Sequence, residues 1–130
     1  TIYETDADNI KIMTIISNSK TDANPEYIVN EQLEVYNNRD VNGFIKTYAD
    51  DVMLFTFPYT LNIEGHDALK KQYAPFFKST PDLNAEIVNR IVIGNKVIDK
   101  EKVLVNGKTI YAIAIYEIQN GLISRVTFIQ

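Results

Sequence analysis

Four apolar runs joined by glycine-containing turns occupy the second half of the chain, and they constrain its fold more than any other feature. The runs are residues 84–93, 96–105, 108–118 and 122–129. The turns between them contain Gly94-Asn95, Asn106-Gly107 and Asn120-Gly121. An Asn-Gly pair between β-branched runs predicts a tight hairpin, because both central positions of a type I′ turn need a positive φ. The sequence therefore predicts an antiparallel meander of four strands.

The first half predicts two short amphipathic helices. Asn24-Pro25-Glu26 is typical of a helix start, with Asn as the cap and Pro at the first helical position, and this helix extends to about Asn37. The second helix begins after Asp40, whose carboxylate can cap the first turn. Apolar residues then fall at i, i+3, i+4, i+7 and i+8, which predicts a helix through Ala49; these residues are Val41, Phe44, Ile45, Tyr48 and Ala49.

A strand and a third helix follow. Residues 52–57 are rich in apolar and aromatic residues and predict a buried strand that Pro58 closes, with a loop over residues 59–64. The third helix begins at Gly65, and we expect Pro75 to kink or end its last turn. Its buried face would comprise Ala68, Leu69, Tyr73, Phe76 and Phe77. Helices first and sheet after is the α+β pattern.

Length, charge and composition limit the classes of function. The 130 residues fit one domain, which we place at residues 24–130 behind an N-terminal arm of residues 1–23. A net charge of −4 without a Lys/Arg cluster argues against a nucleic-acid partner. We expect no membrane partner, since no run approaches the ~20 apolar residues of a membrane span. The segment before Ile10 is acidic, unlike the basic start of a signal peptide, and the compartment stays open between cytoplasmic and exported.

The residue types also limit metal and cofactor chemistry. The chain has no cysteine and a single histidine, His66, which excludes disulfides, thiolate or multi-histidine metal sites and histidine-based triads. We expect His66 to lie at the surface. Asp50-Asp51 is more typical of a solvated helix end than of a metal pair. We therefore expect no metal and no cofactor.

The order of elements and three motifs resemble the nuclear transport factor 2-like superfamily, and within it the SnoaL-like and ketosteroid-isomerase-like small proteins. The motifs are YNNRDVNGFIKTYADDV at 36–52, GHDAL at 65–69 and IAIYEIQNGLISRVTFI at 113–129. The resemblance implies a cone-shaped fold in which three N-terminal helices pack in a strongly curved antiparallel sheet. It also implies a deep apolar pocket and, commonly, a homodimer formed through the outer face of the sheet.

This sequence lacks most of the catalytic residues that its resemblance to the isomerases implies. The resemblance puts their carboxylate base at Phe57 and their oxyanion-hole tyrosine at Gln32, and no acid stands near Ala114 to Tyr116, where their second donor would lie. Only a supporting tyrosine is matched, by Tyr73. Because abstraction of a proton next to a carbonyl needs both a base and a donor for the enolate, we do not expect ketosteroid isomerisation.

The candidate ligand-binding residues are mostly aromatic. Their rings could form the wall and mouth of the pocket, with phenol groups orienting the ligand, or they could simply fill the core. The set consists of Tyr36, Phe55, Phe57, Tyr59, Tyr73, Phe77 and Tyr116, with Arg90 as a cation from the sheet.

The candidate catalytic residues are Asp99 and Glu101, which alternate with lysines and so share one face of their strand. They could face the cavity, with Asn89 or Arg90 as partners, and serve as acid or base. They could instead belong to an exposed edge with cross-strand charge pairs. We expect Arg125 to pair with a strand neighbour such as Glu117.

The sequence thus predicts a small-molecule pocket protein with an apolar ligand, which is a binding protein or an enzyme of unassigned chemistry. The alternative is a non-catalytic dimerisation module on the same fold.

Overall fold

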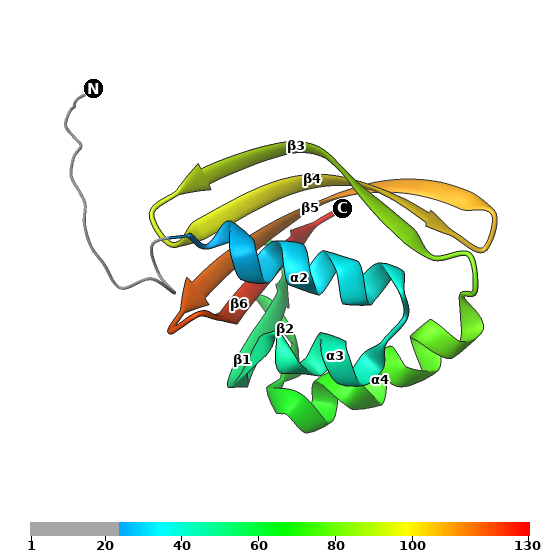
Figure 1. Cartoon of the computed structure of the whole chain (residues 1–130), viewed down its shortest axis with the longest axis horizontal. Helices are drawn as coiled ribbons and strands as arrows, with labels where there is room; N and C mark the ends of the chain where they lie inside the picture. The colour runs from blue at the N-terminus through cyan, green and yellow to red at the C-terminus, as the bar shows by residue number, and fades with distance from the viewer. Residues whose placement is uncertain (1–23) are drawn as a thin grey trace.

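The computed structural model describes residues 24–130, so the predicted arm of residues 1–23 lies outside the described residues. Three helices, α2 (Glu26–Asn37), α3 (Val41–Lys46) and α4 (Gly65–Ser79), combine with a single six-stranded sheet (Figure 1). The strands are β1 (Tyr48–Thr56), β2 (Thr60–Glu64), β3 (Asn84–Ile93), β4 (Lys96–Val105), β5 (Lys108–Gln119) and β6 (Leu122–Ile129).

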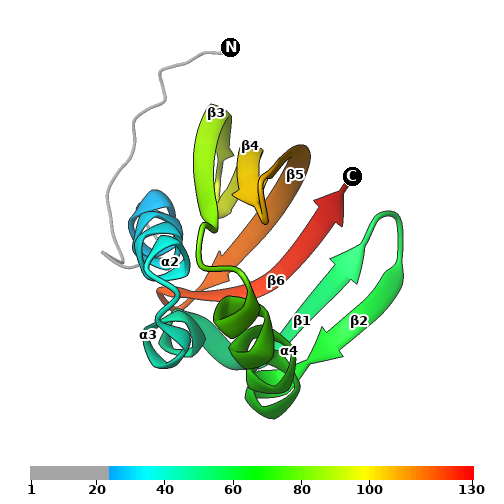
Figure 2. The same ribbon diagram turned by 90° about the vertical axis from the view of Figure 1, so that its right-hand side faces the viewer.

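The strands lie in the order β2-β1-β6-β5-β4-β3. Only the β1–β6 pair is parallel, and every other neighbouring pair is antiparallel. The sheet is strongly bent, and the three helices lie on its concave side (Figure 2). The predicted α+β fold with a curved sheet around the helices is confirmed.

The predicted hairpin turns are present. Asn106, Gly107, Asn120 and Gly121 all have positive φ, between 51° and 78°, as the two hairpin turns require. At the start of α2, Pro25 rather than Asn24 occupies the N-cap position. The side chain of Asn24, one residue earlier, accepts a hydrogen bond from the backbone N–H of Glu26 (3.2 Å).

The boundary between α3 and β1 differs from the prediction. The side chain of Asp40 caps α3 by accepting from the Gly43 N–H at 3.0 Å, as expected. The helix nevertheless ends at Lys46 rather than Ala49, and Tyr48 already pairs with Ile123 of β6. The carbonyl of Thr47 accepts a hydrogen bond from the Ile123 N–H (3.0 Å). Pairing with β6 therefore ends the helix about one turn before its predicted end. Tyr48 still points into the core, which is why its apolar position matched a helical period.

One further expectation for the middle of the chain was wrong. Residues 60–64 are not a loop but strand β2, which pairs antiparallel with β1 so that Leu54 lies opposite Ile63. A short turn containing Pro58 connects the two strands. Of the two effects expected of Pro75, a kink or an end of the last turn, it does not end α4, which continues to Ser79.

The core is built around the ring of Phe44. Its centroid lies 4.7 Å from that of Tyr73, 4.9 Å from that of Tyr48 and 5.3 Å from that of Phe77. The sheet closes this cluster with small and branched side chains, among them Val97, Ala114, Ile118, Ile123 and Val126. The aromatic cluster joins all three helices to the concave face and fixes the position of the helices over the sheet. None of the helices in residues 24–130 is long and apolar enough to cross a membrane.

Candidate functional site

A cavity of about 590 Å³ lies between α4 and the concave face of the sheet. Most of its lining is apolar, with walls from both strands and helix: Leu54, Ile63, Pro75, Phe76, Val103, Val105, Ile110, Ala112 and Phe128. A smaller space of about 50 Å³ lies deeper, under α2 and α3, and includes Gln32, Tyr48 and Tyr116 in its lining. The two cavities share Tyr36, Tyr73, Glu101 and Phe128, so these residues mark the inner end of the larger one.

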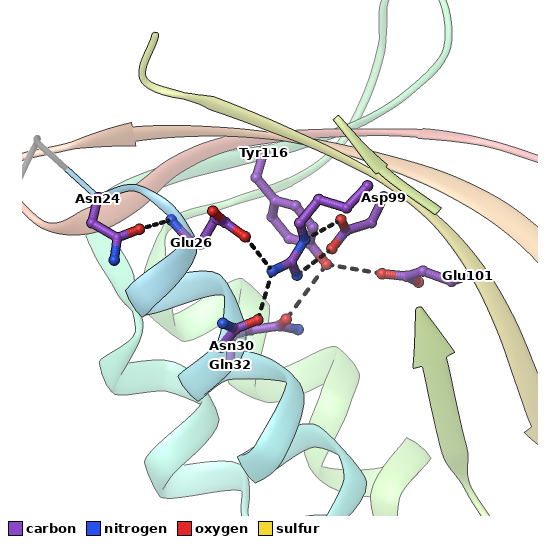
Figure 3. A network of polar contacts seen from close by, with 8 residues as sticks. Asn24, Glu26, Asn30, Gln32, Asp99, Glu101 and Tyr116 are labelled. Carbon is purple, nitrogen blue, oxygen red and sulfur yellow. Dashed lines mark hydrogen bonds and ion pairs between the residues drawn. The ribbon is translucent and has the colours of Figure 1, made fainter. Parts of the chain in front are cut away.

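Glu101 is the acidic side chain at this inner end. Strand alternation places it on the concave face of β4 between Asp99 and Val103. The hydroxyl of Tyr116 donates to Glu101 Oε2 at 3.2 Å and lies 3.4 Å from Gln32 Oε1 (Figure 3). Burial raises the pKa of Glu101 from 4.5 to about 7; the bond from Tyr116 lowers that pKa, and the nearby Asp99 charge raises it. Glu101 can therefore hold or release a proton near neutral pH.

Asp99, the second predicted acid, has a different environment. It is fully buried (0% exposed) and is held by the guanidinium of Arg90, with Nε–Oδ1 at 2.6 Å and Nη2–Oδ2 at 2.9 Å. Arg90 Nη1 also donates to Asn30 Oδ1 (2.7 Å) and to Glu26 Oε1 (3.2 Å) of α2 (Figure 3). Asp99 lines neither of the two cavities. The Arg90–Asp99 pair is thus a structural link between β3, β4 and α2.

Each of the two interpretations of the acids holds in part. β4 is flanked by β3 and β5, so it is not an exposed edge. Asp99 nevertheless forms a cross-strand charge pair, with Arg90, while Glu101 faces the cavity. Of the two partners considered, Arg90 pairs with Asp99, whereas Asn89 lies opposite Lys100.

Tyrosine hydroxyls surround Glu101. Burial, with a smaller contribution from the nearby Glu101 charge, raises the pKa of Tyr73 to about 12. Burial likewise raises the pKa of Tyr36, Tyr48 and Tyr116 above the ordinary value. All four phenols therefore keep their protons at neutral pH and can donate hydrogen bonds.

The structure brings only part of the predicted ligand-binding set together. Tyr36, Tyr73 and Tyr116 line the cavities, whereas Phe77 is packed in the aromatic core outside both linings. Arg90 is occupied by Asp99.

Three more of the predicted aromatics do not line the cavities. Leu54 and Thr56 point inward from β1, so Phe55 between them lies on the outer face, where the Arg125 guanidinium lies 4.2 Å from its ring centroid. Phe57 and Tyr59 lie in the β1–β2 turn and are 57% and 83% exposed. Strand alternation puts Val103 and Val105 on the same face of β4 as Glu101, so these two lining residues could have been predicted from the sequence. The lining residues of α4 and β6 could not, because their position depends on tertiary packing.

The remaining charged candidates have structural contacts. His66 Nε2 lies 2.8 Å from the Tyr48 carbonyl and Nδ1 lies 3.7 Å from Asp50 Oδ1, at the start of α4. Arg125 Nε lies 3.8 Å from Glu117 Oε2, the partner that was expected. Residues 24–130 contain no group of three or more His, Asp or Glu side chains that could hold a metal ion.

Comparison with known proteins gives the family and the fold. The family model of the SnoaL-like domain matches residues 29–126. No curated protein matches the sequence. Similar solved structures include an uncharacterised cystatin-fold protein from Novosphingobium aromaticivorans, with a TM-score of 0.76 and 22% identity over 82% of this chain and 97% of that one.

Two other similar structures have names that include an activity. A proposed polyketide cyclase from Sinorhizobium meliloti has a TM-score of 0.69 and 20% identity over 85% of this chain and 99% of that one. An LEH-like epoxide hydrolase from M. tuberculosis has a TM-score of 0.68 and 13% identity over 81% of this chain and 80% of that one. At these identities the likeness shows the fold alone.

Proposed function

The chain belongs to the SnoaL-like domain family, and we propose that it binds a small, largely apolar molecule in the cavity under α4 and transfers a proton to or from it through Glu101. The observation that carries this proposal is the protonatable carboxyl of Glu101 at the inner end of an apolar cavity. The volume of about 590 Å³ lies within the range of small-molecule sites, which combine apolar walls with a few converging polar groups.

The groups around Glu101 favour acid–base chemistry next to an oxygen atom. A carboxyl whose pKa is near the working pH can take a proton in one step and return it in the next. The hydroxyls of Tyr36 and Tyr73 line the same space and would stabilise negative charge that develops on a carbonyl oxygen of the ligand. The names of two similar structures, a proposed polyketide cyclase and an epoxide hydrolase, support a reaction of this broad class.

The contact between Tyr116 and Glu101 suits both protonation states. When Glu101 is charged, the Tyr116 hydroxyl donates to it. When Glu101 holds the proton, the same hydroxyl can turn to Gln32 Oε1, which lies 3.4 Å away, and accept from the acid. Ketosteroid isomerisation is not proposed, because Phe57 is in an exposed turn and Gln32 replaces the tyrosine.

Binding is tested with N-phenyl-1-naphthylamine, an uncharged apolar dye that fluoresces when it leaves water. We expect saturable binding to the protein and its loss in Ala112→Phe, because Ala112 lines the cavity and the added ring fills it. Thr109→Phe is the matched control, since Thr109 is exposed on the same strand and lines no cavity. Equal dye binding by the Ala112 variant and the wild type would refute the cavity as the binding site.

Proton transfer is tested with 2-tetralone, a ketone with acidic protons next to its carbonyl. In D₂O, NMR would follow exchange of these protons, in which Glu101 removes a proton and deuterium is returned to the same carbon. We expect protein-dependent exchange that rises with pH through about 7, as Glu101 ionises, and falls to background in Glu101→Gln. Exchange that is unchanged in this variant would remove Glu101 from the chemistry.

We also propose a homodimer formed through the outer face of the sheet, because one row of cross-strand partners on that face is almost entirely apolar. The row crosses all six strands and consists of Ile91, Ile98, Ile115, Thr127, Phe55 and Leu61. Ile91 and Leu61, on the two edge strands, are 61% and 45% exposed, whereas Phe55 is buried with the Arg125 guanidinium over its ring. Exposed apolar side chains in such a row support an interface. Light scattering should give a dimer mass that Ile115→Glu halves, and a strict monomer at micromolar concentration would contradict this proposal.

A further inference from the structure

We propose that the cavity selects an elongated apolar molecule with an anionic group at one end and an uncharged carbonyl or hydroxyl at the other, and that Lys71 of α4 binds the anionic end. This inference rests on the proposed function, because it names the class of ligand for the same cavity. Its basis is the distribution of polar groups along the cavity wall.

The polar groups of the cavity lie in two sets. Tyr36, Tyr73 and Glu101 form the inner set, which is shared with the deeper space under the helices. The outer set belongs to the larger cavity alone and consists of Thr56, Asn62, Lys71, Gln72 and Gln130. The remaining wall is apolar. A ligand that satisfies both sets therefore needs two polar groups and an apolar body between them.

The side-chain charges of the two sets differ in sign. Among the side chains of residues 24–130 that line the cavity, only Glu101 and Lys71 can carry a full charge at neutral pH. Lys71 is exposed, and no ion pair within residues 24–130 includes it. No acidic side chain stands in the outer set, so the outer end of the cavity favours an anion.

The orientation of the ligand follows from the same charges. An anionic group placed at the inner end would meet Glu101 when that carboxyl is ionised, and the two like charges would repel each other in a desolvated space. An uncharged carbonyl or hydroxyl can instead accept from Tyr36 or Tyr73 and exchange a hydrogen bond with Glu101. The anionic group is thus directed to Lys71, and the group that undergoes proton transfer is directed to Glu101.

Three probes of equal chain length test the inference: 10-hydroxydecanoate, decane-1,10-diol and decanoate, each measured by displacement of N-phenyl-1-naphthylamine. We expect 10-hydroxydecanoate to bind about three- to fivefold more tightly than the diol, the effect of one partly exposed charge pair. Added salt should reduce this advantage, because it screens the pair. Decanoate should also bind more weakly than 10-hydroxydecanoate, since it lacks the hydroxyl for the inner set.

Variants on α4 assign the effect to one side chain. Lys71→Met should abolish the advantage of the carboxylate over the diol, so that this variant binds the two probes equally. Lys70→Met is the matched control, because Lys70 is an exposed neighbour on the same helix that does not line the cavity, and it should keep the advantage. Circular dichroism spectra would verify that both variants are folded.

The outcomes separate this inference from the proposed function. If the dye binds but the diol and the hydroxy acid displace it equally, or if Lys71→Met keeps the preference, the inference is overturned and the cavity remains a binding site. Failure of all three probes to displace a bound dye overturns the inference in the same way. If the dye itself does not bind, the proposed function fails, and this inference fails with it.

Discussion

Replacing Glu101 with glutamine should stabilise the protein at pH 8 and leave its stability at pH 4 almost unchanged. Below pH 4.5 the carboxyl is protonated in both the folded and the unfolded protein. Between pH 4.5 and about 7 the unfolded chain releases this proton first, because burial raises the pKa of the folded carboxyl to about 7. At 1.36 kcal/mol per pH unit, wild-type stability falls across this window by about 3 kcal/mol, a loss that persists at higher pH.

Glutamine removes the charge and keeps the shape. Its side-chain carbonyl can still accept the hydrogen bond from Tyr116, so the variant differs from the wild type chiefly in having no carboxyl to ionise. Urea unfolding followed by circular dichroism from pH 4 to pH 8.5 gives the free energy of unfolding for both proteins. The difference between them should grow from near zero to about 3 kcal/mol across the window.

An exposed glutamate on the same sheet provides the control. Glu86→Gln removes a carboxyl from β3 at a position open to solvent, so its difference from the wild type should stay small and nearly constant with pH. The reasoning is refuted if the curves of the Glu101 variant and the wild type run parallel from pH 4 to pH 8.5. Parallel curves would mean that the folded carboxyl is as well solvated as the unfolded one, and Glu101 would lose its suitability as a neutral-pH acid or base.

Three further predictions concern stability and can be measured by the same urea unfolding. Arg90→Met should lower the free energy of unfolding by about 3–5 kcal/mol, because it leaves the buried Asp99 charge without a partner. Arg125→Met removes a half-exposed pair and should lower the free energy of unfolding by less than about 1 kcal/mol. Phe44→Ala should cost about 3–5 kcal/mol through the cavity left in the aromatic core, and a loss below about 1 kcal/mol would contradict its central place. Gly107→Ala should cost about 1–2 kcal/mol from backbone strain alone, since φ is 78° and no atom lies within 4 Å of the added Cβ.

The features that could be predicted from sequence are those fixed by short-range chemistry. The turns at Asn106-Gly107 and Asn120-Gly121 need positive φ within the turn itself, so the meander of β3 to β6 follows from neighbouring residues. The boundary at Tyr48 depends instead on a hydrogen bond between Thr47 and Ile123, which are 76 positions apart, and no local pattern contains that information. Strand β2 was missed for a different reason: it pairs with β1 across a short turn, whereas Pro58 predicts the end of the strand and a loop over the residues after it.

The candidate site also combines features that follow from neighbouring residues with features that depend on pairing between strands. Strand periodicity alone put Asp99 and Glu101 on one face, and the structure keeps them there. Their different environments depend on a register shift in β3 between Ile87 and Asn89. Ile87 lies opposite Glu101, so a regular ladder would bring Asn89 opposite Asp99; the one extra residue brings Arg90 there instead. A bulge of this kind is a property of the paired strands, which is why the sequence left both partners open.

The register shift also explains why one acid of the pair faces the cavity with its charge uncompensated. Arg90 is held by Asp99 and by Glu26, so this cation is already paired with two carboxylates. Glu101 receives a hydrogen bond from Tyr116 but makes no ion pair within residues 24–130. We expect this charge to be balanced by a proton, in keeping with the raised pKa of Glu101, and the cavity would give the proposed ligand access to the carboxyl. On a fold whose isomerase-type members are expected to place a base on the first strand, this chain places a protonatable carboxyl on β4, and the Arg90–Asp99 pair would keep the neighbouring acid out of the proposed reaction.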